Sequence, residues 1–114
     1  MAPKSKRVKH TVKYLASGPD PKIVTQILRK ADNPLVKGIA NAALNVTRGE
    51  VPLTRKKKQL FARHRKLFEV LTAKKHPINA KRKFVQQGGA LGALIPIILS
   101  TVLGTLGSAI FNRQ

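Results

Sequence analysis

Apolar residues recur at helical spacing over most of the chain, and no strand-like alternation accompanies them. Between residues 21 and 31 the apolar positions lie three or four residues apart, at Ile23, Val24, Ile27, Leu28 and Ala31. Asp20 followed by Pro21 is typical of a helix N-terminus, because the carboxylate caps free backbone N–H groups and proline fits the first turn. We therefore predict a helix that begins at Pro21.

The same pattern predicts further helices downstream. Asn33-Pro34 repeats the start signal, and an apolar stripe then runs to Val46 before Gly49, which is expected to end the second helix. Thr54 is the expected cap of a third and longest helix, from about Arg55 to Lys74. One arc of its helical wheel, about 120° wide, holds the apolar side. The members of this arc are Leu60, Phe61, His64, Leu67, Phe68 and Leu71.

These elements predict an all-α fold, a small basic helical bundle of about three helices. We expect the bundle to cover residues 20–75, preceded by a flexible basic arm over residues 1–19. Residues 76–89 are expected to be a basic linker or short helix ending in Gly88-Gly89, and residues 90–114 a Gly-rich apolar helix or tail. The chain contains no cysteine, so disulfides cannot brace so small a core.

The charge of the chain is extreme and unevenly distributed. The net charge is +19, with 23 Lys and Arg against four Asp and Glu, and residues 84–112 carry no charge. Such an excess indicates a polyanionic partner, above all double-stranded DNA bound through its phosphates. No DNA-reading motif is present, so the expected binding is blind to sequence. The candidate phosphate-binding residues are Lys4, Lys6, Arg7, Lys9, Arg55, Lys56, Lys57, Lys58, Arg63, Arg65, Lys66, Lys74, Lys75, Lys81, Arg82 and Lys83.

Groups that could perform catalysis or hold a metal ion are sparse. The four acids are scattered along the chain, and His10, His64 and His76 lack the spacing of metal ligands. His64, on the apolar side of its predicted helix, is expected to be a packed or boundary residue. We therefore predict no enzyme activity, no cofactor and no metal site.

The C-terminal segment from Gly88 to Phe111 is long and apolar enough to cross a bilayer, which takes about 20 residues. Its glycines and Pro96 disfavour an isolated helix. Three interpretations stand: a transmembrane anchor, a reversibly membrane-active segment, or a buried self-association element. The residues expected to carry the apolar contact are Leu91, Leu94, Ile95, Ile97, Ile98, Leu99, Val102, Leu103, Leu106, Ile110 and Phe111.

Several short motifs in a fixed order resemble a known viral family. The order is Ala42-Ala43-Leu44-Asn45-Val46, Val51-Pro52-Leu53-Thr54, Arg63-His64-Arg65-Lys66, and then Gln86-Gln87-Gly88-Gly89-Ala90 before Leu94-Ile95-Pro96-Ile97. The part from Lys83 to Ile98 resembles the C-terminal region of the adenoviral core protein X precursor. The upstream motifs, followed by the same Gly-Gly and apolar tail, resemble a minor virion protein of Maverick/Polinton elements and their adintovirus relatives. The likeness covers about residues 20–110.

The resemblance implies a protein that packages or condenses double-stranded DNA inside a capsid. It also implies cutting by a viral cysteine protease at Gly88-Gly89-Ala90, between Gly89 and Ala90. A hinge or helix terminator is the alternative interpretation of Gly88-Gly89. The expected location is the virion interior, with the host nucleus or cytoplasm during assembly, since no apolar stretch of a secretory signal follows the basic N-terminus.

The sequence thus favours a structural virion protein that condenses DNA, with its tail anchoring it to capsid proteins, to other copies of the chain or to a membrane until the tail is cut. The first alternative is a membrane-active or membrane-anchored viral protein acting through the apolar segment, with basic residues on anionic headgroups. The second alternative is a capsid-lining cement protein.

Overall fold

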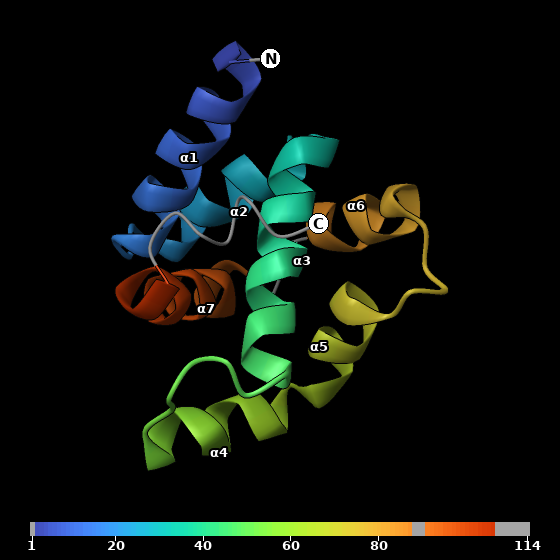
Figure 1. Ribbon diagram of the computed structural model, residues 1–114. Coiled ribbons are helices and arrows are strands. Elements are labelled where there is room, and N and C mark those ends of the chain that lie inside the picture. Colours follow the sequence, from blue (N-terminus) through green and yellow to red (C-terminus); the bar gives the residue numbers. More distant parts are fainter. Residues whose placement is uncertain (1, 88–90, 107–114) are drawn as a thin grey trace.

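A computed structural model describes the backbone of residues 2–87 and 91–106 and the side chains of residues 7–87 and 91–104. This part of the chain is all-helical, which confirms the expected fold class, but it forms seven helices rather than about three (Figure 1). The helices are α1 (Ala2–Ala16), α2 (Pro21–Arg29), α3 (Asn33–Thr47), α4 (Arg55–Arg63), α5 (Arg65–Thr72), α6 (Ile78–Gln86) and α7 (Leu91–Leu106).

Side-chain caps fix the starts of three helices. Asp20 Oδ1 accepts a hydrogen bond from the Lys22 N–H at 2.8 Å, as its position before Pro21 predicted. Thr54 Oγ1 caps α4 by accepting from the Lys57 N–H at 3.2 Å, also as predicted. At α3 the cap is Asp32, one residue before the predicted Asn33-Pro34 signal. Each cap satisfies a backbone donor that the helix itself leaves free.

The N-terminal segment is a helix, so the expectation of a flexible arm was wrong. Val8, Val12 and Leu15 of α1 are buried, and α1 packs against α3 and α7. These three residues are spaced by four and three positions, which places them on one face of a helix. Lysines between them obscure this stripe in the sequence.

The predicted long helix from Arg55 to Lys74 is broken into α4 and α5 at His64, where φ is −111° and ψ is 32°. The break turns α5 so that it packs against α3 and α6. Phe61 of α4 and Phe68 of α5 contact each other edge to face across the break, with ring centroids 5.2 Å apart. His64 itself is half-buried, at the boundary that its wheel position indicated.

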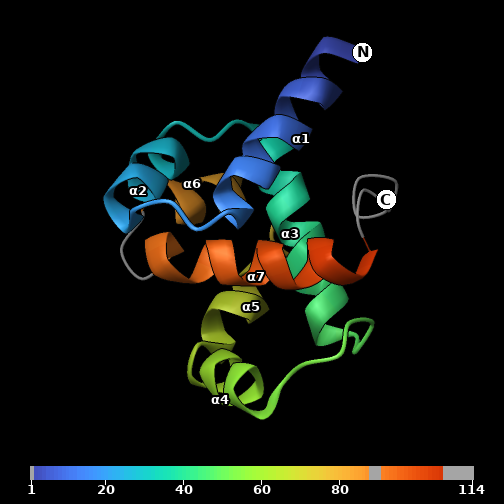
Figure 2. The ribbon, with the colours of Figure 1, turned by 90° about the vertical axis from the view of Figure 1, so that its left-hand side faces the viewer.

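The apolar C-terminal segment forms α7, which runs across the front of the fold in Figure 2 and packs against α1, α2 and α3. The side chains buried there are Leu91, Leu94, Ile95, Ile98, Leu99 and Val102. A helix that is apolar on all sides is stable either in lipid or within a protein core. Here other helices of the same chain cover it, and the Cα radius of gyration is 12.8 Å, close to the ~13 Å of a folded domain of this length.

The crossing of α2 and α7 depends on a small residue. A Cβ atom placed on Gly92 would lie 2.5 Å from Thr25 Oγ1 and 3.1 Å from the Pro21 carbonyl oxygen. Both distances are shorter than ordinary van der Waals contact, so glycine is what allows the N-terminal end of α7 to approach α2 this closely.

No single helix among the described residues has both the length and the hydropathy to cross a membrane. Residues Ile78–Gln86 and Leu91–Gly104 satisfy these criteria only as a pair, bent by 119°.

Candidate nucleic-acid interface

The densest group of exposed cations lies on α4 and α5. We define the α4–α5 surface by residues that are all exposed to solvent, namely Arg55, Lys56, Lys58, Arg63, Arg65 and Lys66. The apolar residues of the same helices, Phe61, Leu67, Phe68 and Leu71, are buried. Because the two helices bury one side, their cationic side is held toward solvent. Lys57, the remaining predicted cation of α4, is half-buried.

The junction of α4 and α5 borders a hollow of about 450 Å³ that is open to solvent. Arg63, His64, Arg65 and Lys66 line one part of it. Leu67, Leu91 and Phe84 supply apolar lining, and Gln87 adds an amide. The break at His64 therefore brings the four residues of the Arg63-His64-Arg65-Lys66 motif to one hollow. In a continuous helix these four consecutive residues would point in different directions around the helix axis.

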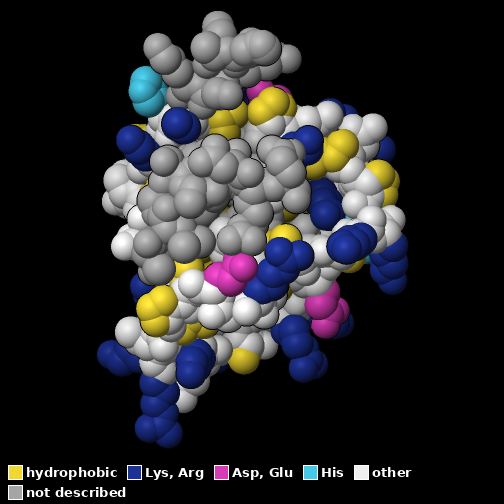
Figure 3. All heavy atoms as spheres, viewed as in Figure 1, with side chains coloured by type: hydrophobic (Ala, Val, Ile, Leu, Met, Phe, Trp, Pro, Cys, Tyr) yellow, Lys and Arg dark blue, Asp and Glu magenta, His cyan; other side chains and the backbone are white. Residues whose placement is uncertain are grey.

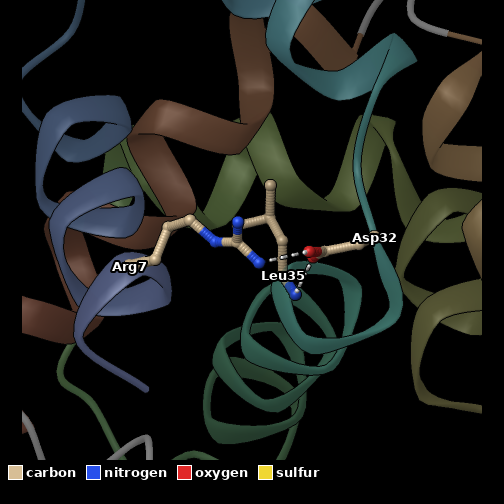
Figure 4. Close-up of polar contacts among 3 residues, drawn as sticks. All are labelled: Arg7, Asp32 and Leu35. Atoms are coloured by element: carbon tan, nitrogen blue, oxygen red, sulfur yellow. Dashed lines mark hydrogen bonds and ion pairs between the residues drawn. The ribbon is translucent and has the colours of Figure 1, made fainter. Parts of the chain in front are cut away.

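The acidic residues are engaged in local structure. Asp32 Oδ1 accepts a hydrogen bond from the Leu35 N–H at 3.1 Å, and its Oδ2 lies 3.7 Å from Arg7 Nη2 (Figure 4). Glu69 Oε1 lies 3.8 Å from Arg65 Nε, one helical turn away on α5. Both ion pairs are exposed and are worth at most about 1 kcal/mol each. They leave Arg7 and Arg65 able to exchange a carboxylate for a phosphate.

The cations of α6 differ in exposure. Lys83 is exposed, whereas Lys81 and Arg82 are half-buried. Burial lowers the pKa of Lys81, because desolvation disfavours its charged form. Arg82 Nη1 donates to Asn33 Oδ1 at 3.1 Å, and Gln86 Nε2 donates to the Ala31 carbonyl at 2.9 Å. Arg82 thus helps attach α6 to the start of α3.

The remaining predicted residues are spread over the molecule. Arg7 and Lys9 on α1 are exposed, as are Lys74 and Lys75 after α5. The backbone of Lys4 and Lys6 belongs to α1, but their side chains lie outside the described residues. The predicted cleavage site, Gly88-Gly89-Ala90, also lies outside them, as do Ile110 and Phe111.

Among the residues whose side chains the structure describes, six further exposed cations are absent from the sequence-based set. They are Lys13, Lys22, Arg29, Lys30, Lys37 and Arg48. The sequence offered one signal for those on α2, since Lys22 and Arg29 are seven residues apart and so share a helix face. Isolated lysines elsewhere carry no comparable signal.

Figure 3 shows Lys and Arg side chains over this view of the protein, several of them projecting at the lower end near α4 and at the right beside α5 and α6. Within the described part of the chain, no group of three or more His, Asp or Glu could hold a metal ion. No protein-family model, curated protein or solved structure matches the chain.

Proposed function

We propose that the protein is a structural virion protein that binds and condenses double-stranded DNA without reading its sequence. The observation that carries the proposal is the outward display of cations on several helices of one compact fold. Arginine and lysine side chains that neutralise phosphates release counterions from the duplex, and this term supplies most of the affinity in non-specific binding.

The structural roles of the acidic residues support this function. Asp20 and Asp32 cap helices, and Glu69 is paired with Arg65. Of the α4–α5 surface, Arg65 is the cation that forms an ion pair with a carboxylate among the described residues. A protein whose cations served only solubility would need far less excess charge.

The packing of α7 argues for the DNA hypothesis over the membrane hypothesis. Insertion into a bilayer would require α7 to leave α1, α2 and α3, against which it packs. The apolar side chains of those helices would then be exposed to water, at a cost of about 1.5–3 kcal/mol for each side chain that loses its cover. Several such side chains together cost as much as the total stability of a typical domain, about 5–15 kcal/mol.

The test is a salt series of binding to two 20-base-pair duplexes of unrelated sequence, followed by fluorescence anisotropy. We expect equal affinity for both duplexes and a steep linear fall of log K with log salt concentration. In the variant Lys56→Gln/Arg63→Gln/Lys66→Gln the slope should become shallower by up to about three, close to one for each cation that no longer neutralises a phosphate. A flat slope in the wild type, or a strong preference for one duplex, would contradict the proposal.

The virion interior, contact with capsid proteins and cutting by a viral cysteine protease are parts of the proposal supported by the sequence resemblance. The fold adds a physical consequence for the proposed cut between Gly89 and Ala90. It would sever the backbone ahead of α7 while the apolar side chains of α7 remain packed against α1, α2 and α3. Loss of the folded state would follow only when α7 dissociates.

A further inference from the structure

A second cationic surface lies on α2, outside the residues that the sequence motifs singled out. Lys22 and Arg29 on α2 and Lys30 at its C-terminal cap are exposed, on the side opposite the buried Val24 and Leu28. We call these three cations, with the polar side chains between them, the α2 surface. Those polar side chains are Thr25 and Gln26.

The α2 surface has the shape and chemistry of a phosphate-contacting site. Two open hollows of about 350 and 410 Å³ follow one another along it and share Gln26 and Arg29 as lining residues. Lys22 and Arg29 are separated by about 10 Å of helix rise, the axial length of about three phosphates on one strand. Side-chain amides such as that of the exposed Gln26 also commonly contact phosphates. The carboxylate of Asp20, at the start of α2, is held at the helix cap by the Lys22 N–H.

The α2 surface and the α4–α5 surface lie on opposite sides of α7. In Figures 1 and 2, which share a vertical axis, α1 and α2 lie above α7, whereas α4 and α5 lie below it. The Debye length is ~8 Å at physiological ionic strength, so the cations of each surface act mainly on phosphates close to that surface.

One duplex cannot easily serve both surfaces. DNA has a persistence length of about 50 nm, and bending 20–30 base pairs by even 40–90° costs about 1–6 kcal/mol. Reaching from the α4–α5 surface to the α2 surface would need a larger turn around a particle whose longest extent is 37 Å. Two straight duplexes, one at each surface, avoid this deformation.

We propose that one copy of the protein bridges two DNA duplexes, with the α2 surface holding the second. This inference rests on the proposed DNA-binding function and adds its geometry: condensation results from crosslinking by a rigid two-ended particle. Neither wrapping of DNA nor pairing of protein copies is required.

The test is capture of a fluorescent 20-base-pair duplex by an identical duplex fixed to beads, with the protein as the only link. The α2 variant Lys22→Gln/Arg29→Gln/Lys30→Gln should reduce capture by about tenfold or more, while its affinity for one duplex stays within about fivefold of wild type, since the α4–α5 surface is intact. The matched control, Lys13→Gln/Lys37→Gln/Arg48→Gln, removes the same charge from exposed positions outside both surfaces and should capture as wild type does. Circular dichroism checks that each variant is folded.

Equal capture by the α2 variant and the control would overturn the inference, because bridging would then depend on total charge or on association of protein copies. A wild-type protein that binds one duplex but captures no second one would overturn it as well, leaving the proposed function standing. Absence of binding to any duplex would instead refute the proposed function itself.

Discussion

Replacing Ile98 by alanine tests whether α7 is part of the core in solution. Ile98 lies in the middle of α7 and is fully buried. Removing its outer methyl and methylene groups leaves a cavity among helices that can close only in part, and such changes cost about 2–5 kcal/mol. For a chain of this size, about 4 °C per kcal/mol converts this loss into a fall of roughly 8–20 °C in Tm.

The assay is thermal unfolding followed by circular dichroism at 222 nm, in moderate salt so that charge repulsion is screened. Ser100→Ala is the matched control, because Ser100 is an exposed residue of the same helix. It should change Tm little. If Ile98→Ala and Ser100→Ala unfolded at the same temperature as wild type, α7 would not be packed in the core. The argument that core packing of α7 opposes its insertion into a membrane would then fail as well.

Four other changes follow from particular contacts. Asp32→Ala removes the cap of α3 and the ion pair with Arg7, and should lower the free energy of unfolding by about 0.5–2 kcal/mol in urea titrations. Arg7→Ala removes only the ion pair and should cost less. Equal losses of stability in the two variants would contradict the capping role of Asp32. Gly92→Ala should lower the free energy of unfolding by about 1–3 kcal/mol because its new Cβ meets Thr25. Adding Thr25→Ala in a double variant should restore part of that loss. The control Gly104→Ala, whose Cβ meets nothing within 4 Å among the described residues, should be neutral or stabilising. Asn45 is fully buried, and its side-chain amide has no hydrogen-bond partner among the described residues. Asn45→Leu should therefore raise the free energy of unfolding by about 1–3 kcal/mol in the same titrations. A loss of stability would indicate that the amide has a polar partner. Burial lowers the pKa of Lys81 in the folded state below its usual 10.5. Between the folded and unfolded pKa values the unfolded chain binds more protons, so the free energy of unfolding rises as pH increases through that window. Lys81→Met should therefore raise Tm at pH 7 more than the exposed control Lys83→Met does, and the difference in Tm should shrink toward pH 10.5.

Local features were readable from the sequence wherever one residue type acts on its immediate neighbours. The caps at Asp20 and Thr54 and the end of α3 near Gly49 depend on backbone donors and turns a few residues away. Apolar spacing likewise predicted helices throughout residues 21–72. The excess of cations is a property of composition, and it indicated a polyanionic partner without any knowledge of the fold.

Neither the end of α4 nor the place of α1 in the fold could be predicted from the sequence. The break at His64 lets both Phe61 and Phe68 be buried, and α5 then packs against α3 and α6, which no local pattern encodes. The stripe Val8, Val12 and Leu15 is short and interrupted by lysines. Its helix is stabilised by burial against α3 and α7, which lie far along the chain.

Sequence alone was enough to establish a helical protein that is strongly cationic in its first 83 residues and apolar near its C-terminus. What covers the apolar segment, and which cations share a surface, depended on how the helices pack. Hydropathy measures only the preference of α7 to leave water, and a protein core satisfies that preference as well as a bilayer does. The same packing places α2 and α4 on opposite sides of α7, because each helix packs on different neighbours along the chain.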